Sequence, residues 1–280
     1  MTVKKIINAI IYRSRYAFTK GLYKTSRSYY AVFGSRVQCN ICNYRCNKMD
    51  SDGWHKFSIC PNCGTGVRQR LLWATLQSAG EYNIDTLIKN KAVLHFAPEK
   101  ALSNRLELKA SKYKTADYLA EGYLTSYHHI DYNMDISDMH QLQDGEYDCI
   151  IACDVLEHVV DDKKGLKEVY RVLATGGYCI FTVPQKDNLA TTYQDQSVTD
   201  PEERKEKFGQ ADHLRIYGND FVQHMKDAGF AAVQVDENNF DKKQQVKNVL
   251  YPPVLSAHPL ATNYRKIFIG HKNGGNHYSL

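Results

Sequence analysis

Short apolar segments alternate with longer amphipathic ones from residue 91 to the end of the chain. The runs AVLHF, YDCIIAC and YCIFTVP have the length and composition of buried strands. Between them, EKALSNRLELKA and DDKKGLKEVYRVLATGG show the apolar spacing of helices, and glycines close the second one. This alternation predicts an α/β fold in which helices cover both faces of a mostly parallel sheet.

Acidic residues follow the predicted strands of this region, namely Glu99, Asp117, Asp135 and Asp154. In parallel sheets ligands bind beyond the carboxyl ends of the strands, where these side chains would meet. The segment VLHFAPEK, residues 93–100, leads from the first strand into a helix without a glycine. A ligand at this turn would therefore meet Ala97 and Pro98 in place of the bare backbone of a glycine-rich loop.

Two pairs of cysteines precede the alternating region. They form two C-x2-C motifs separated by seventeen residues, at Cys39, Cys42, Cys60 and Cys63. Thiolates at this spacing are typical of a zinc site, and a site with four protein ligands is structural. The spacing predicts a zinc-ribbon-like domain over residues 37–66. Two disulfides or a redox pair are the alternatives, and Cys46 or His55 could replace one of the four ligands.

The N-terminal residues 1–36 are strongly basic. They hold eight Lys and Arg and no acid, so the rest of the chain, whose total is +5, carries a net charge of −3. Apolar residues at helical spacing favour a helical arm, which either packs on the body or contacts a membrane surface or a nucleic acid. Residues 67–90 are interpreted as a helical bridge to the main domain.

The apolar stretches are shorter than the roughly 20 residues that a membrane span needs. The segment IINAII is too short for a signal-peptide core, and a small-residue cleavage site does not follow it. We therefore expect a soluble, cytoplasmic protein. Contact of the basic arm with the inner membrane surface is a variant of this hypothesis.

The stretch YDCIIACDVLEHVVDDKKGLKEVYRVLATGGYCIFTVP, residues 147–184, resembles class I S-adenosylmethionine-dependent methyltransferases of the type 11-like family. The strand, the LEHV turn and the helix ending RVLATGG follow the family's order, and YGNDFVQHMKDAGF is similar to the helix before its sixth strand. The resemblance covers residues 91–271. It implies a doubly wound, seven-stranded Rossmann-like sheet in a domain of residues 91–280. The sequence departs from the family at VLHFAPEK, where the family has an acid followed by GxGxG.

The resemblance implies S-adenosylmethionine as the cofactor and assigns its contacts one residue at a time. Asp117 would accept hydrogen bonds from the ribose hydroxyls, and Asp135 would accept one from the adenine amino group. The carboxylate of Glu99 suits the start of a helix and could accept hydrogen bonds from the cofactor's amino group. A degenerate domain that has lost its cofactor is the alternative. The cofactor-binding candidates are His95, Ala97, Pro98, Glu99, Asp117, Asp135, Ile136 and Cys153.

Candidates for the chemistry follow the fourth and fifth predicted strands. Transfer to a hydroxyl requires an aligned nucleophile and removal of its proton, which a histidine can perform near neutral pH. The catalytic candidates are Asp154, His158 and His213, the last within a polar lid insertion over residues 185–217. A purely structural turn is one alternative. The other alternative is that these residues bind a second ion, a divalent cation. Some methyltransferases that act on ubiquinone precursors or RNA 3′ ends bind a metal with a similar set of residues. Here that set would be Asp154, Glu157, His158 and His213.

These features favour a methyltransferase that acts on a hydroxyl or amine of a small polar acceptor, such as a sugar or glycan intermediate. The acceptor class rests on the polarity of the lid. One alternative is an RNA methyltransferase that grips phosphates with the ribbon and the basic arm, although the body is net acidic and four thiolates around zinc add negative charge. The other alternative is a non-catalytic interaction protein whose fold is stabilised by zinc.

Overall fold

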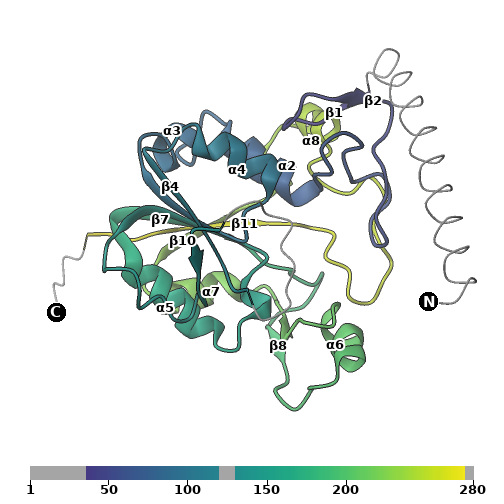
Figure 1. Ribbon diagram of the computed structural model, residues 1–280. Helices are drawn as coiled ribbons and strands as arrows, with labels where there is room; N and C mark the ends of the chain where they lie inside the picture. The colour runs from purple at the N-terminus through teal and green to yellow at the C-terminus, as the bar shows by residue number, and fades with distance from the viewer. Residues whose placement is uncertain (1–35, 120–129, 275–280) are drawn as a thin grey trace, which may run out of the picture.

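The computed structural model describes residues 36–119 and 130–274. The predicted basic arm, apart from Arg36, lies outside the described residues. Figure 1 shows three parts: a central sheet between two layers of helices, the cysteine-containing segment at one end of the sheet, and the segment with α6 below it. In the described part of the chain, no helix is both long and apolar enough to cross a bilayer.

The central sheet has seven strands in the order β10-β11-β7-β6-β3-β4-β5. Strand β11 is antiparallel to both of its neighbours, and the pairs β7-β6, β6-β3, β3-β4 and β4-β5 are parallel. This arrangement confirms the predicted doubly wound Rossmann-like sheet. The strands are β3 Ala92–Phe96, β4 Lys112–Asp117, β5 Tyr132–Asn133, β6 Tyr147–Cys153, β7 Leu173–Thr182, β10 Ala231–Val235 and β11 Ile267–His271.

Helices cover both faces of the sheet (Figure 1). On one face lie α2 Val67–Leu76, α3 Ile84–Leu87 and α4 Lys100–Glu107; on the other lie α5 Asp162–Val172 and α7 Phe221–Asp227. Strand β6 shows how the sequence builds both layers. Ile150 and Ala152 belong to the core cluster beneath α5 and α7, while Cys149, Ile151 and Cys153 belong to the opposite one. Successive side chains of a strand point to opposite faces, so a fully apolar strand serves two cores.

The helix α5 is shorter than the sequence pattern indicated. It ends at Val172, and the ATGG segment that was expected to close it belongs to β7. Gly177 lies so close to β6 that a Cβ there would be 2.7 Å from the carbonyl oxygen of Asp148, and Gly176 adopts a φ of +80°. These glycines therefore bend a strand where it meets its neighbour, at the register shift between β6 and β7.

The cysteine-containing segment packs directly on the main domain. It contains β1 Val37–Gln38 paired with β2 Arg45–Cys46, and its buried residues share a core cluster with α2. The guanidinium of Arg70 is fully buried and donates to the carbonyl oxygens of Ser58 and Thr65 in the segment and of Val249 after α8 Lys242–Asn248. A buried guanidinium is stable only when its donors are satisfied, so Arg70 fixes these two parts to each other.

Residues 185–217, the predicted lid, form a small folded unit. It contains β8 Tyr193–Gln194, α6 Pro201–Phe208 and β9 Arg215–Ile216, around a core of Val198, Phe208 and Ile216. Arg215 is buried and donates to the carbonyl oxygen of Leu156, the first residue of the short 3-10 helix η1 Leu156–His158, and to that of Val160, which follows this helix. The lid is thereby attached to the turn that follows β6. The remaining element, η2, spans Glu237–Asn239.

Candidate active site

The four predicted zinc ligands lie together in the segment that precedes α2. The Sγ atoms of Cys39 and Cys63 are 3.7 Å apart and those of Cys42 and Cys60 are 3.6 Å apart, and all four lie within 4.8 Å of one another. Tetrahedral Zn–S bonds of about 2.3 Å would place the sulfurs about 3.8 Å apart. The donor set and its dimensions fit a zinc ion. Cys46 and His55, the two spare candidates, lie outside this group.

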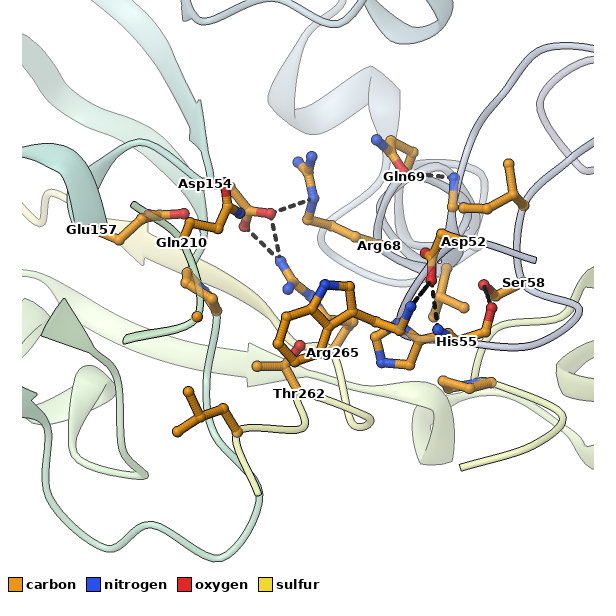
Figure 2. Close-up of a pocket in the computed structure, with 18 of the residues that line it drawn as sticks. Asp52, His55, Ser58, Arg68, Gln69, Asp154, Glu157, Gln210, Thr262 and Arg265 are labelled. Carbon is orange, nitrogen blue, oxygen red and sulfur yellow. Dashed lines mark hydrogen bonds and ion pairs between the residues drawn. The ribbon is translucent and has the colours of Figure 1, made fainter. Parts of the chain in front are cut away.

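A pocket of about 360 Å³ lies between the cysteine segment, the carboxyl ends of β6 and β7, the lid and the loop before β11. Figure 2 shows Asp52, His55 and Ser58 at one side of it and Asp154 and Glu157 at the other, with Arg68 and Arg265 between them. Clefts of this size commonly hold small molecules in enzymes. The segment predicted to be a zinc ribbon therefore forms one wall of the candidate active site.

The inner end of the pocket carries a network of charged side chains. The guanidinium of Arg68 lies 2.5 Å from Oε1 of Glu99 and 3.0 Å from Oδ2 of Asp154. Arg265 contacts the other oxygen of Asp154 at 2.5 Å, and the hydroxyl of Thr182 donates to it at 2.8 Å. Burial alone would raise the pKa of Asp154, but Arg265 and Arg68 outweigh burial and hold that pKa below its usual range.

The backbone at this end is held in an uncommon conformation. Ala97, after β3, has a φ of +44°, and Asp154, after β6, has a φ of +53°. Residues with side chains rarely adopt this left-handed region, so both turns store strain of roughly 1 kcal/mol or more each. The two turns lie at neighbouring strand ends, at the point where the strand order reverses, which is where doubly wound sheets bind ligands.

Glu99 lies at the start of α4 and faces the same network. Burial raises the pKa of its carboxyl, although Arg68 beside it opposes the shift. Its Oε1 also accepts a hydrogen bond from the side chain of Gln69, whereas its buried Oε2 has no hydrogen-bond partner in the described part of the chain. Glu99 thus retains one acceptor for a ligand.

Three other cofactor candidates lie along the same edge of the sheet. Asp117 ends β4 and accepts a hydrogen bond from the backbone of Tyr118, and burial raises its pKa. Asp135 follows β5 and accepts one from the backbone of Ser137. Cys153 ends β6 and is buried, which raises the pKa of its thiol to about 12. The segment between β4 and β5 includes residues 120–129, which lie outside the described ranges.

Two candidates have side chains within the core. His95 is fully buried on the face of β3 that meets α2 and α4, its Nδ1 lies 2.6 Å from the hydroxyl of Tyr113, and burial lowers its pKa to about 3. Ile136 is buried in the other core cluster, where a Cβ on Gly165 would touch it at 3.5 Å. Neither side chain lines the pocket, so any contact of these positions with a ligand would be made by their backbone.

His213, one of the three residues proposed for the chemistry, forms the outer end of the pocket together with Glu157. Glu157 and His213 both line the pocket, with exposed fractions of 1% and 3%. Nδ1 of His213 is 3.1 Å from the carbonyl oxygen of Phe208, which can only accept, so Nδ1 carries the proton and Nε2 presents a lone pair. Neither that Nε2 nor Oε2 of Glu157 has a hydrogen-bond partner among the residues described.

His158 contacts His213 but is not among the residues that line the pocket. The two rings are 4.8 Å apart, and Nδ1 of His158 is 3.3 Å from a carboxylate oxygen of Asp212. Ligand atoms of Glu157, His158 and His213 lie within 4.8 Å of one another, but Asp154 is not part of this group because its oxygens face Arg68 and Arg265. The structure thus brings three residues of the predicted divalent-cation set together and places the fourth in the charged network.

Several lining residues were not found from the sequence. Arg68 and Arg265 are separated by almost 200 positions and follow no motif, and Trp54 and His55 lie in the cysteine segment, whose spacing indicates metal ligands only. The proximity of VRQR to the second C-x2-C motif was the only available indication for Arg68. Tertiary packing alone brings these residues to Asp154.

Two family models match the chain, both described as a methyltransferase domain, over residues 63–181 and 124–250. They overlap at β6, and together they span residues 63–250. The chain therefore contains a methyltransferase domain. This methyltransferase is also 37% identical, over 68 residues, to an uncharacterized 37.1 kDa protein in transposon TN4556 of Streptomyces fradiae. That match covers 24% of the chain and only 20% of the relative's length.

Solved structures similar to this methyltransferase include an S-adenosylmethionine-dependent methyltransferase from Mesorhizobium loti, with 14% identity, a TM-score of 0.48, and coverage of 74% of this chain and 98% of that one. Another is the Burkholderia thailandensis 1,6-didemethyltoxoflavin-N1-methyltransferase, with 12% identity, a TM-score of 0.42, and coverage of 66% and 72%. At these values the family assignment rests on the two domain models.

Proposed function

We propose that this methyltransferase takes its methyl group from S-adenosylmethionine and transfers it to a hydroxyl or amine of a small polar acceptor, such as a sugar or glycan intermediate. The observation that carries the proposal is the adjacency of two different sites. A charged network lies at the strand ends where doubly wound sheets bind ligands, and beside it the pocket presents a histidine lone pair.

The charged network suits the methionine end of the cofactor, which bears an ammonium, a carboxylate and a positive sulfonium. Glu99 has an acceptor for the ammonium, and Arg68 and Arg265 present donors to the carboxylate. Asp117 and Asp135 remain our candidates for the ribose and adenine, and the backbone at His95, Ala97, Pro98, Ile136 and Cys153 for the rest. When bound, the cofactor supplies an electrophilic methyl group.

The outer end of the pocket suits the acceptor. A hydroxyl becomes a competent nucleophile only when its proton leaves as the new bond to carbon forms. Nε2 of His213 can take that proton, because burial lowers the pKa of His213 and keeps the ring neutral at pH 7. His158 supports the ring of His213 by direct contact. Asp154 is ionised and held by two arginines, so we assign it to positioning and leave proton removal to His213.

We also propose that Cys39, Cys42, Cys60 and Cys63 hold a structural zinc ion. The sulfur spacing fits tetrahedral coordination, and four thiolates leave no position for a substrate. The role of the zinc would be to fold a segment too short to be stable alone, and thus to hold the pocket wall that this segment supplies.

RNA is the weaker candidate for the acceptor. Of the basic side chains in the cysteine segment and early α2, Arg70 is buried against carbonyl oxygens and Arg68 is paired with two carboxylates. Lys48 lies over the ring of Phe57. These contacts leave fewer cations of the ribbon for phosphates than its composition indicated, and phosphate contacts supply most of the affinity for nucleic acid.

The test is transfer from tritiated S-adenosylmethionine into cell extract separated into RNA, protein, lipid and glycan or small-molecule pools. We expect label in the glycan or small-molecule pool and its loss in His213→Gln. Label in nuclease-sensitive material would replace the acceptor class with RNA. Calorimetry with S-adenosylhomocysteine runs in parallel, and a protein that fails to bind it would overturn the cofactor assignment and favour a non-catalytic interaction protein.

A further inference from the structure

We infer that the loop of the cysteine segment over residues 52–58 recognises the methyl acceptor, and that this acceptor is a neutral polyhydroxylated ring, such as a sugar. The inference rests on the proposed function, since it assigns the acceptor end of the same pocket. It gives the zinc-ribbon-like segment a role in substrate selection besides its role in the fold.

The loop lines the pocket with an indole and an imidazole. Trp54 lines the pocket with 40% of its surface exposed, and its ring is fixed at 4.3 Å from that of His258. His55 also lines it, and its buried Nε2 has no hydrogen-bond partner within the described ranges. The backbone amides of Trp54 and His55 both donate to Asp52, which holds the loop in shape.

The protonation of His55 makes it an acceptor. Burial lowers the pKa of its ring, and Arg265 lowers it further against the opposing effect of Asp52. A neutral imidazole has one N–H and one lone pair, and Nδ1 faces the carboxylate of Asp52 at 3.8 Å, which favours the proton at Nδ1 and the lone pair at Nε2. The pocket therefore has imidazole lone pairs from both the loop and the lid.

The unpartnered groups around the pocket match hydroxyls better than ions. His55 and His213 present acceptors, Glu157 presents a carboxyl whose pKa burial raises well above its usual range, and Nε of Arg265 presents a donor. A phosphate or carboxylate needs donors and would face the two imidazole lone pairs, which can only accept. Each hydroxyl of a sugar both donates and accepts, and the C–H bonds of its ring pack on an indole face such as that of Trp54.

The charge balance of the pocket also favours a neutral methyl acceptor. Arg68 and Arg265 share Asp154, and Arg68 also pairs with Glu99, so their positive charge is compensated before any acceptor arrives. An acceptor that is itself charged would have to displace one of these ion pairs. A neutral ring would instead satisfy the unpartnered atoms and leave the network intact.

The fluorescence of Trp54 gives a readout that does not need turnover. The chain has two tryptophans, so Trp73→Phe leaves Trp54 as the only one. We would titrate this protein, saturated with S-adenosylhomocysteine, with methyl glycosides of glucose, galactose, mannose and N-acetylglucosamine. At least one should shift the Trp54 emission and show saturation transfer by NMR. No binding by any of the four, or binding of spermidine or an RNA oligonucleotide at this tryptophan, would overturn the inference.

Variants separate recognition from chemistry. His55→Phe removes the lone pair and should weaken glycoside binding, and raise the acceptor KM, about tenfold or more while kcat changes little. His55→Gln should restore part of the affinity. Trp54→Ala should weaken binding, and its matched control is Tyr264→Ala, since Tyr264 has 44% of its surface exposed but does not line the pocket. Equal effects of the two aromatic variants would contradict the inference.

The control that separates the two proposals is the affinity for S-adenosylhomocysteine. If the wild-type protein does not bind it, the proposed function fails and the acceptor assignment has no basis. If it binds, and the His55 and Trp54 variants bind it equally well, a failure of glycoside binding concerns the acceptor class alone.

Discussion

The carboxyl groups at the two ends of the pocket differ in their ionisation and in their pairing. At the inner end Asp154 is ionised, and arginines from two distant segments contact both of its oxygens. At the outer end Glu157 is almost completely buried, has an oxygen without a partner in the described chain, and has a raised pKa. Both oxygens of Asp154 are thus paired before a ligand binds, whereas Oε2 of Glu157 is left for a partner that a ligand would supply.

This difference teaches how one cavity serves two substrates. A preorganised charged network suits a cofactor that every turnover shares, because its polar groups need not reorganise. Unpartnered acceptors suit selection among acceptors, because a molecule lacking the right hydroxyls leaves them unsatisfied. The cysteine segment and the helix after it line the same pocket, since Trp54 and His55 lie within the segment and Arg68 lies at the start of α2.

The largest effect is expected from removing the metal that supports this segment. Structural zinc contributes roughly 10–16 kcal/mol in zinc-finger peptides, so Cys39→Ser or a strong chelator should unfold the segment and disable both ends of the pocket. Metal analysis and thermal melting measure this. Wild-type protein and the control Cys46→Ser should each hold about one zinc per chain. A metal-free protein with an unchanged Tm would contradict the zinc assignment, and a second divalent ion lost in His213→Gln would support the alternative cation site.

The next largest effect is expected from Asp154→Asn at the inner end of the pocket. Asp154→Asn leaves Arg68 and Arg265 without their shared negative charge, and breaking a buried pair costs roughly 3–5 kcal/mol. We expect a lower Tm and a loss of S-adenosylhomocysteine affinity of about a hundredfold or more by calorimetry. The control is Asp200→Asn, since Asp200 caps α6 and asparagine caps a helix equally well. Equal affinities of the two variants would show that the network does not hold the cofactor.

The third effect separates chemistry from binding at the outer end. His213→Gln should lower kcat by roughly 10²–10⁴-fold, as for loss of a general base, while S-adenosylhomocysteine binds as before. The base works only as the neutral ring, and burial lowers its pKa, so the wild-type rate should rise with pH through a value below 6.5 and stay level near pH 7. The rate of label transfer, measured as a function of pH, tests this expectation. If His213→Gln still showed the same rise of rate with pH, His213 would be excluded as the base.

The smallest effect is expected from Glu157→Gln, which should raise the Tm, whereas Asp154→Asn should lower it. The pKa of Glu157 is raised in the folded protein, so the unfolded chain releases a proton that the folded one keeps, and stability falls as pH rises above the usual carboxyl range. Glu157→Gln should therefore raise the Tm by a few degrees at pH 8, and this gain should vanish toward pH 4. Thermal melts at both pH values test it, and a pH-independent difference would contradict a neutral buried Glu157.

The sequence by itself determined the parts of this protein that depend on local spacing. Apolar periodicity predicted a mostly parallel sheet between helices, because a strand that serves two cores must be apolar throughout. The number of seven strands was implied by the family resemblance. The C-x2-C pairs indicated the cysteine cluster, because short knuckles place their sulfurs by local geometry. Asp154, Glu157 and His213 were found because residues after parallel strands meet at one edge of the sheet.

Tertiary structure decided what depends on long-range packing. His95 is a cofactor candidate by its place in a motif, and the alternation of β3 turns its side chain into the core beside Tyr113, so that only its backbone remains for a ligand. The ATGG segment has the pattern of a helix end, but its close approach to β6 makes it part of a strand. The association of Arg68 and Arg265 with Asp154, and of the cysteine segment with the acceptor pocket, joins residues far apart in sequence through buried contacts such as those of Arg70, which no local pattern encodes.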